Sequence, residues 1–184
     1  MTSGYANPMD TGVFLLRIVV GLLLAGHGSQ KLFGWFGGHG LEGTGGFLHS
    51  LGYKPGKRFA AVAGLSEFCG GLLFALGLFT PLAAAAIIGT MFNATMSVHA
   101  KNGPWVTEGG YEYTLVIGTA AAAVAFTGPG AASLDNAIGW NLSGTGWGLA
   151  ALALGLGAGI VTDIYRRVAN RSPQLRSRDV QATA

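Results

Sequence analysis

Five apolar stretches constrain the fold of this chain more than any other feature. They cover about residues 12–33, 59–79, 82–100, 111–127 and 147–165. Most approach the ~20 residues that a helix needs to cross ~30 Å of hydrocarbon at ~1.5 Å per residue. The fourth stretch is short and rich in alanine, so its crossing is the weakest of the five predictions. We therefore predict an all-α fold, a polytopic membrane helix bundle.

The composition supports this class. Half of the 184 residues are hydrophobic (50%), only 10% are charged, and the mean hydropathy is +0.45. A soluble domain would carry about a quarter charged residues, so a water-soluble protein is excluded.

The length suits one transmembrane domain over residues 1–165, with an interfacial loop at 34–57, followed by a basic tail at 166–184. The net charge of +3 comes largely from that tail, which suits anionic lipid headgroups and not nucleic acid.

The basic residues predict the orientation. Five crossings place ten of the eleven Lys and Arg residues on one side of the bilayer. That side is expected to be the cytoplasm, because loops rich in Lys and Arg stay inside. The N-terminus is then outside and the C-terminus inside. The ten residues are Lys31, Lys54, Lys57, Arg58, Lys101, Arg166, Arg167, Arg171, Arg176 and Arg178.

The loop at 34–57 contains a predicted short helix between Thr44 and Gly52. Thr44 can cap its start, and Gly52 can end it. Its apolar face is expected to lie at the cytoplasmic interface of the membrane.

Polar residues within the spans are the functional candidates, because ionisable groups at bilayer depth are costly and usually turn toward the bundle interior. Glu67 belongs to a stripe of small residues with Ala60, Gly64 and Gly71, so it is predicted to face another helix. Glu67 has two interpretations. In the first it is structural, as a partner of Arg17 or as a hydrogen-bonded, protonated acid. In the second it exchanges protons with a bound redox headgroup. The full set of candidates is Arg17, His27, Gln30, Lys31, Glu67, Asn93, His99 and Glu112.

Four of these residues agree in depth within about two helical turns, or ~11 Å. We predict that His27, Glu67, Asn93 and His99 converge in the cytoplasmic half on a pocket for a quinone headgroup. A quinone needs one or two donors, an acid or histidine that takes a proton, and apolar walls. His27, Glu67 and His99 are the candidate catalytic groups.

The candidate cofactor-binding residues are His27, Gln30, Lys31, Asn93 and Glu112. The two histidines could instead be ordinary interfacial residues, or they could ligate a haem, although the chain has no CxxCH attachment motif. No metal site is predicted. The cofactor itself is not fixed by these residues, and quinone is one candidate.

Several segments resemble the DoxX family of small prokaryotic membrane proteins. The most specific parts are the span with Arg17 and His27-Gly-x-x-Lys31, the Glu67-x-x-Gly-Gly71 span, and the Gly-Pro-Gly-x-x-Ser-Leu-Asp turn. The resemblance implies a core of four helices, to which this chain adds a fifth span and a basic tail. The segments are LLRIVVGLLLAGHGSQKLFGWFGG, GTGGFLHSLGY, GLSEFCGGLLFALGLFTPLAA and GPGAASLD.

The resemblance also implies a function. Related proteins include membrane subunits linked to thiosulfate:quinone oxidoreduction and members that assemble with redox-protective enzymes. Arg17, His27, Gln30, Lys31 and Glu67 match the intramembrane polar pattern of the family, but no thiosulfate-binding motif is present. We therefore expect a protein of the prokaryotic inner (plasma) membrane that is associated with a redox system, binding quinone or serving as a membrane subunit of an oxidoreductase. The alternative is a non-enzymatic scaffold or assembly subunit. The expected partners are the lipid bilayer and either redox complex subunits or further copies of the chain.

The predicted topology can be tested with reporter fusions. A C-terminal alkaline phosphatase fusion should be inactive, because the tail is expected to lie in the cytoplasm. An active fusion, or an N-terminus found in the cytoplasm, would overturn the predicted orientation.

Overall fold

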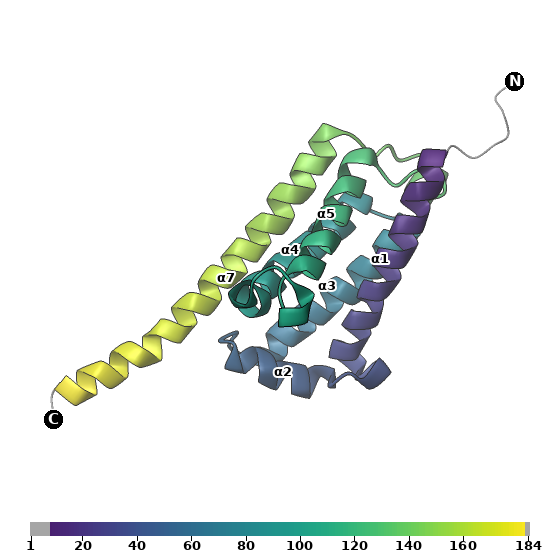
Figure 1. The fold of residues 1–184 in the computed structure, drawn as a ribbon. Helices are drawn as coiled ribbons and strands as arrows, with labels where there is room; N and C mark the ends of the chain where they lie inside the picture. Colours follow the sequence, from purple (N-terminus) through teal and green to yellow (C-terminus); the bar gives the residue numbers. More distant parts are fainter. Residues whose placement is uncertain (1–7, 183–184) are drawn as a thin grey trace, which may run out of the picture.

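The computed structural model describes the backbone of residues 8–182 and the side chains of residues 8–170. This part of the chain forms seven α-helices and no strand (Figure 1). Short 3₁₀ turns and one π-helical turn occupy some of the connections. The helices are α1 (Pro8–Phe33), α2 (Gly40–Ser50), α3 (Gly56–Leu76), α4 (Thr80–Ala94), α5 (Glu112–Thr127), α6 (Leu134–Ala137) and α7 (Thr145–Ala182).

Four helical segments are long and apolar enough to cross a membrane, judged by length and composition: Pro8–Phe33, Gly56–Leu76, Thr80–Asn102 and Thr145–Asn170. The remaining predicted span, residues 111–127, corresponds to α5, which is apolar but has only 16 residues, or ~24 Å of helix. Large apolar side chains such as Leu22 and Leu154 point outward and are more than half exposed, as expected for side chains that face lipid. The predicted polytopic all-α bundle is confirmed.

Glycines end several helices where the sequence predicted breaks. Gly103 and Gly128 follow the ends of their helices with positive φ, which a residue without a Cβ adopts at low cost. The predicted start of the loop helix is wrong, however. α2 begins at Gly40, four residues before Thr44, so Thr44 lies inside the helix and cannot cap it.

The segment after Tyr165 is also more regular than a simple tail. The backbone of α7 continues as one helix from Thr145 to Ala182, past the predicted end of the last span (Figure 1). The side chains of Arg171, Arg176 and Arg178 lie outside the described residues.

Glycines allow α1 and α3 to pack very closely. A Cβ added at Gly28 would lie 2.7 Å from the carbonyl oxygen of Gly64, and one added at Gly21 would lie 2.7 Å from the amide nitrogen of Ala75. Small residues at helix contacts let two backbones approach each other in a membrane, where close packing is a main source of stability. The spacing of Gly21 and Gly28 along α1 therefore sets the register of α1 against α3.

α4 is the central helix of the bundle and packs against α3, α5 and α7. Its buried side chains include Ile87, and Phe74 of α3 lies in the same apolar core. The short helix α2 lies across one end of the bundle (Figure 1). We call this end the α2 end and the opposite end, where Arg17 is buried, the Arg17 end.

Arg17 joins three parts of the chain at the Arg17 end. Its side chain is 1% exposed and donates hydrogen bonds to the carbonyl oxygens of Pro129, Ala132 (2.6 Å) and Ala75 (3.4 Å). In a hydrocarbon layer no water is present to satisfy these carbonyl groups, so a fork of guanidinium donors is an effective substitute. Arg17 therefore ties α1 to α3 and to the α5–α7 connection.

Asp135 fixes the neighbouring turn between α3 and α4. Its fully buried carboxylate accepts hydrogen bonds from the backbone amide of Phe79 (2.8 Å) and from both the amide (2.9 Å) and hydroxyl (2.7 Å) of Thr80. A carboxylate at a helix N-terminus satisfies free amides and interacts favourably with the helix dipole. Asp135 thus caps α4 from the distant α6.

Replacing Arg17 with Met should destabilise the protein strongly, by roughly 3–5 kcal/mol, because buried backbone acceptors lose their donors at about 1–3 kcal/mol each. Arg17→Lys should restore little of this stability, since one ammonium group does not reproduce the planar fork. Thermal unfolding in detergent measures both effects, with the exposed Arg58→Met as control. Equal melting temperatures for all three variants would contradict the proposed role of Arg17.

Candidate functional site

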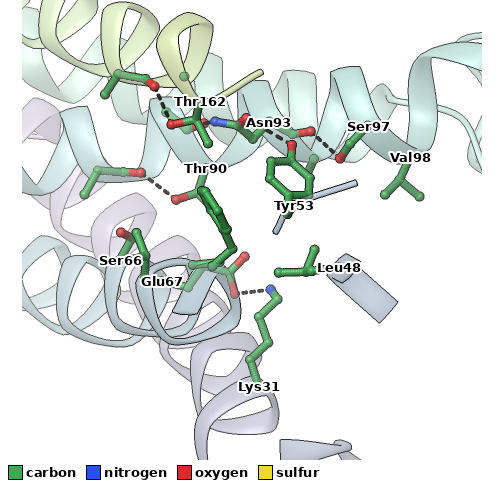
Figure 2. Close-up of a pocket in the computed structure, with 18 of the residues that line it drawn as sticks. Lys31, Leu48, Tyr53, Ser66, Glu67, Thr90, Asn93, Ser97, Val98 and Thr162 are labelled. Carbon is green, nitrogen blue, oxygen red and sulfur yellow. Dashed lines mark hydrogen bonds and ion pairs between the residues drawn. The ribbon is translucent and has the colours of Figure 1, made fainter. Parts of the chain in front are cut away.

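A cleft of about 380 Å³ opens on one face of α4, between α3 and α7. α3 and α7 each pack against α4 but not extensively against each other, which leaves the space between them. Figure 2 shows the polar side chains around this cleft. It is lined by Lys31, Phe47, Leu48, Tyr53, Phe59, Val62, Ala63, Ser66, Glu67, Ala85, Ala86, Gly89, Thr90, Asn93, Ala94, Ser97, Val98, His99, Ala158, Gly159 and Thr162.

Helical spacing explains which residues line the walls. On α3 the lining residues run from Phe59 to Glu67 at intervals of three and four, which places them on one face of the helix. On α4 they are mainly small residues, such as Ala86 and Gly89, which leave room above the helix. At the α2 end, Leu48 of α2 and Tyr53 of the following connection cover the cleft.

An ion pair between Lys31 and Glu67 lies on one side of the cleft (Figure 2). The Glu67 side chain is 5% exposed, and the Lys31 side chain is 30% exposed. The prediction that Glu67 is buried against other helices is confirmed, but its suggested pairing with Arg17 is wrong. Arg17 lies near the opposite end of the bundle, bound to backbone carbonyl groups.

The ion pair leaves hydrogen-bonding capacity for a ligand. Lys31 binds only Oε2 of Glu67, and Oε1 has no hydrogen-bond partner among the described residues. An ammonium group carries three donors, so Lys31 retains N–H groups that it does not use in this pair. A ligand in the cleft could therefore meet both a donor and an acceptor here.

Tyr53 and Asn93 form the polar group across the cleft. The Tyr53 hydroxyl donates to Oδ1 of Asn93 (3.1 Å), and Nδ2 of Asn93 donates to the carbonyl of Gly89 (3.1 Å). Burial raises the pKa of Tyr53 above its ordinary value, although the nearby Ser97 hydroxyl opposes this shift. The phenol therefore stays protonated and remains a donor at neutral pH.

A π-helical turn over Thr95–His99 continues α4 at the α2 end of the cleft. Wider turns of this kind are often found at functional sites. The Ser97 hydroxyl donates to the carbonyl of Asn93 (2.6 Å), which satisfies a backbone group beside the turn. His99 lines the cleft at the end of this turn, and its Nδ1 lies 2.8 Å from the carbonyl oxygen of Gly109.

The other predicted site residues lie elsewhere. His27 is exposed on the outer face of α1, where its Nδ1 lies 3.1 Å from Oε1 of Gln30. Gln30 in turn donates to the carbonyl of Phe36 (3.2 Å) at the end of α1. Glu112 accepts a hydrogen bond from the amide of Val106 (2.9 Å) at the start of α5. The structure thus brings together Glu67, Asn93 and His99, with Lys31, but not His27, Gln30 or Glu112.

Sequence reasoning missed Tyr53, Ser66, Thr90 and Thr162, all of which line the cleft. Tyr53 lies outside the predicted spans, so a search restricted to intramembrane polar residues passed over it. Its position directly after the helix-ending Gly52 was the one available signal, because a large aromatic residue there can fold back over the bundle. The hydroxyl residues gave no comparable signal, since Ser and Thr are common in membrane helices.

This arrangement suits a ligand with a compact polar head and apolar surroundings. Donors and an acid flank the cleft, while most of its walls are aliphatic or aromatic, as is typical of small-molecule sites. Lys31, Glu67, Tyr53 and Asn93 are the residues that could hold such a head. Proton exchange at Glu67 is chemically feasible, because its Oε1 atom has no hydrogen-bond partner in the part of the chain that the structure describes.

The fold defines a multi-pass helical membrane protein with a cleft between its helices. Residues 12–100 match the family model of DoxX, and this match supports membership of the DoxX family. The matched part covers most of α1 and all of α2, α3 and α4, and it therefore includes Lys31, Glu67 and Asn93. No curated protein and no solved structure matches the chain.

The Lys31–Glu67 pair should respond unequally to the loss of either partner. Lys31→Met should cost roughly 3 kcal/mol of stability, near the lower end of values for buried pairs, because it leaves the buried Glu67 carboxylate unpaired. Glu67→Gln should cost only about 1 kcal/mol, since the partly exposed Lys31 can turn toward water.

Thermal unfolding measures these differences. The exposed Lys57–Glu42 pair provides matched controls, because Lys57→Met and Glu42→Gln should each stay within about 1 kcal/mol of wild type. If Lys31→Met were as stable as Lys57→Met, the pair would not be a buried interaction.

Proposed function

We propose that the protein binds a quinone headgroup in the cleft and acts with a membrane redox system. The observation that carries this proposal is the placement of two separate polar groups, Lys31–Glu67 and Tyr53–Asn93, within one otherwise apolar cleft. A quinone has two carbonyl oxygens on opposite sides of a flat ring, so it matches donors on two sides of a cleft. An acid beside one carbonyl could exchange the proton that accompanies reduction.

Each residue has a defined role in this proposal. Lys31 donates to one carbonyl oxygen, and the second N–H of the Asn93 amide donates to the other, while the Tyr53 hydroxyl holds the Asn93 side chain in position. Glu67 accepts a proton from a hydroquinone hydroxyl or returns it. His99, at the α2 end of the cleft, can pass protons between the cleft and the aqueous side, because an imidazole ring can both accept and donate a proton.

The proposal includes a location and orientation. We infer that the protein lies in the inner (plasma) membrane of a prokaryotic cell, with the α2 end in the cytoplasm and the N-terminus outside. The basic residues at the α2 end, including Lys54, Arg58 and Arg166, support this orientation by the positive-inside rule. Residues 1–165 then form the single transmembrane domain, and residues 166–184 are a basic cytoplasmic extension.

The second candidate is a non-enzymatic scaffold or assembly subunit. The continuous helix α7 favours it, because a helical extension past the last predicted span could dock another protein. The two functions predict different effects of substitutions in the cleft. A scaffold would keep its partners when the cleft is altered, whereas a quinone protein would lose its ligand.

Quinone binding to the purified protein in lipid nanodiscs tests the proposal. Wild type should bind saturably, and Glu67→Gln and Asn93→Ala should each weaken binding about tenfold, which corresponds to the loss of roughly one good polar contact. The matched controls Glu42→Gln and Asn136→Ala lie outside the cleft and should bind like wild type. Absence of saturable binding, or equal affinity in all variants, would favour the scaffold.

A further inference from the structure

The cleft is elongated along α4, and its polarity changes along that length. The lining residues on α4 and on the π-helical turn that continues it extend from Ala85 to His99, which corresponds to about 21 Å at the rise of an α-helix. The hydrogen-bonding groups Asn93, Ser97 and His99 lie toward the α2 end. Toward the Arg17 end the lining of α4 consists of Ala85, Ala86 and Gly89.

α7 extends the apolar part of the cleft. Ala158 and Gly159 line it opposite α3, and neither has a polar side chain. Two hydroxyl residues, Thr90 and Thr162, also lie at this level, and each bonds to the backbone of its own helix. Thr90 donates to the carbonyl of Ala86 (2.9 Å), and Thr162 donates to the carbonyl of Ala158 (2.7 Å), so their hydroxyls are satisfied by their own helices.

The cleft also opens toward the surroundings of the bundle. Val62 of α3 is 62% exposed and lines the cleft, and Ala158 of α7 is also exposed. The gap between α3 and α7 narrows near the α2 end, where the rings of Phe59 and Tyr165 pack together with their centroids 5.5 Å apart. In a membrane, the part of this gap nearer the Arg17 end faces hydrocarbon.

From these features we infer that the ligand carries a long apolar tail, which lies on α4 between α3 and α7 and leaves the protein sideways into the bilayer. This inference rests on the proposed quinone headgroup site and adds the class of ligand and its route. The polar head lies at the α2 end and the tail points toward the middle of the bilayer. That orientation is the one an amphipathic lipid-soluble molecule already has in a leaflet, so it can enter without turning over.

The groove must select the tail by shape. Lipid chains are as apolar as the groove, so moving a tail from lipid into protein gains little from the hydrophobic effect. Small residues at Ala63, Ala86 and Ala158 leave the required width. Filling that width should therefore exclude a tail without removing any polar contact to the headgroup.

Two substitutions can test the groove. Ala158→Phe and Ala63→Phe place a ring in the groove from opposite walls, and both positions are at least partly exposed, so the apolar core need not be repacked. Ala153→Phe is the matched control, because Ala153 is exposed on α7 and does not line the cleft. Melting temperatures should confirm that all three variants are folded.

The measurement compares two probes in nanodiscs: a quinone with a full isoprenoid tail and the same headgroup without a tail. Ala158→Phe and Ala63→Phe should each bind the tailed quinone at least about tenfold more weakly than wild type, equivalent to ~1.4 kcal/mol. Their affinity for the tail-less headgroup should differ from that of wild type by less than about twofold. The control should bind both probes like wild type.

Other results would overturn the inference in distinguishable ways. If the filled variants bind the tailed quinone like wild type, the tail does not lie in the groove, although the headgroup site stands. If wild type binds neither probe, the proposed function fails together with this inference. If mass spectrometry instead finds a phospholipid in the groove that the tailed quinone does not displace, the groove holds a structural lipid.

Discussion

The close contact between α1 and α3 determines where the charges of this bundle lie. Gly28 meets Gly64 with no room for a Cβ, and this contact sets the depth of every residue on α1 relative to α3. In that register Lys31 reaches Glu67, while Arg17 reaches Ala75 and the distant carbonyl groups at the other end. Each cation thus finds a partner at its own level, which a hydrocarbon environment requires. A different register would leave buried charges without partners.

The cleft follows from the position of α4. Because α3 and α7 both pack on α4 with little contact between them, a space remains above its small residues. α5 covers another side of α4, so the opening is directed to one face. The connection that carries Tyr53 then folds over the α2 end and joins the two walls through Asn93, Arg166 and the ring contacts of Phe59. The cleft is therefore walled mainly by α3, α4 and α7, with contributions from α1, α2 and the connection that carries Tyr53.

The sequence predicted what depends on local pattern. Hydropathy located the long apolar helices, Gly103 and Gly128 marked helix ends, and the small-residue stripe placed Glu67 in a helix contact. The partner of Glu67 was not predictable, since both Arg17 and Lys31 lie on α1 and only the packing register of glycines chooses between them. The exposed position of His27 was not predictable for a similar reason. His27 and Lys31 are separated by only a small angle around the axis of α1, and only the long Lys31 side chain reaches the cleft. The family match supports the fold but assigns no ligand.

The π-helical turn at Thr95–His99 has a consequence for the evolution of this helix. Such a turn contains one residue more than the α-helical hydrogen-bonding pattern accommodates. Deleting one residue within this turn would let the helix close up into regular α geometry, because the wide turn holds one residue more than an α-helical turn. The side chains between Thr95 and His99 would then point in new directions, while Asn93 and the residues before it would stay in place. The Ser97 hydroxyl and the His99 ring at the α2 end of the cleft could thus be repositioned by a single-codon deletion, with the helices on either side of the turn preserved.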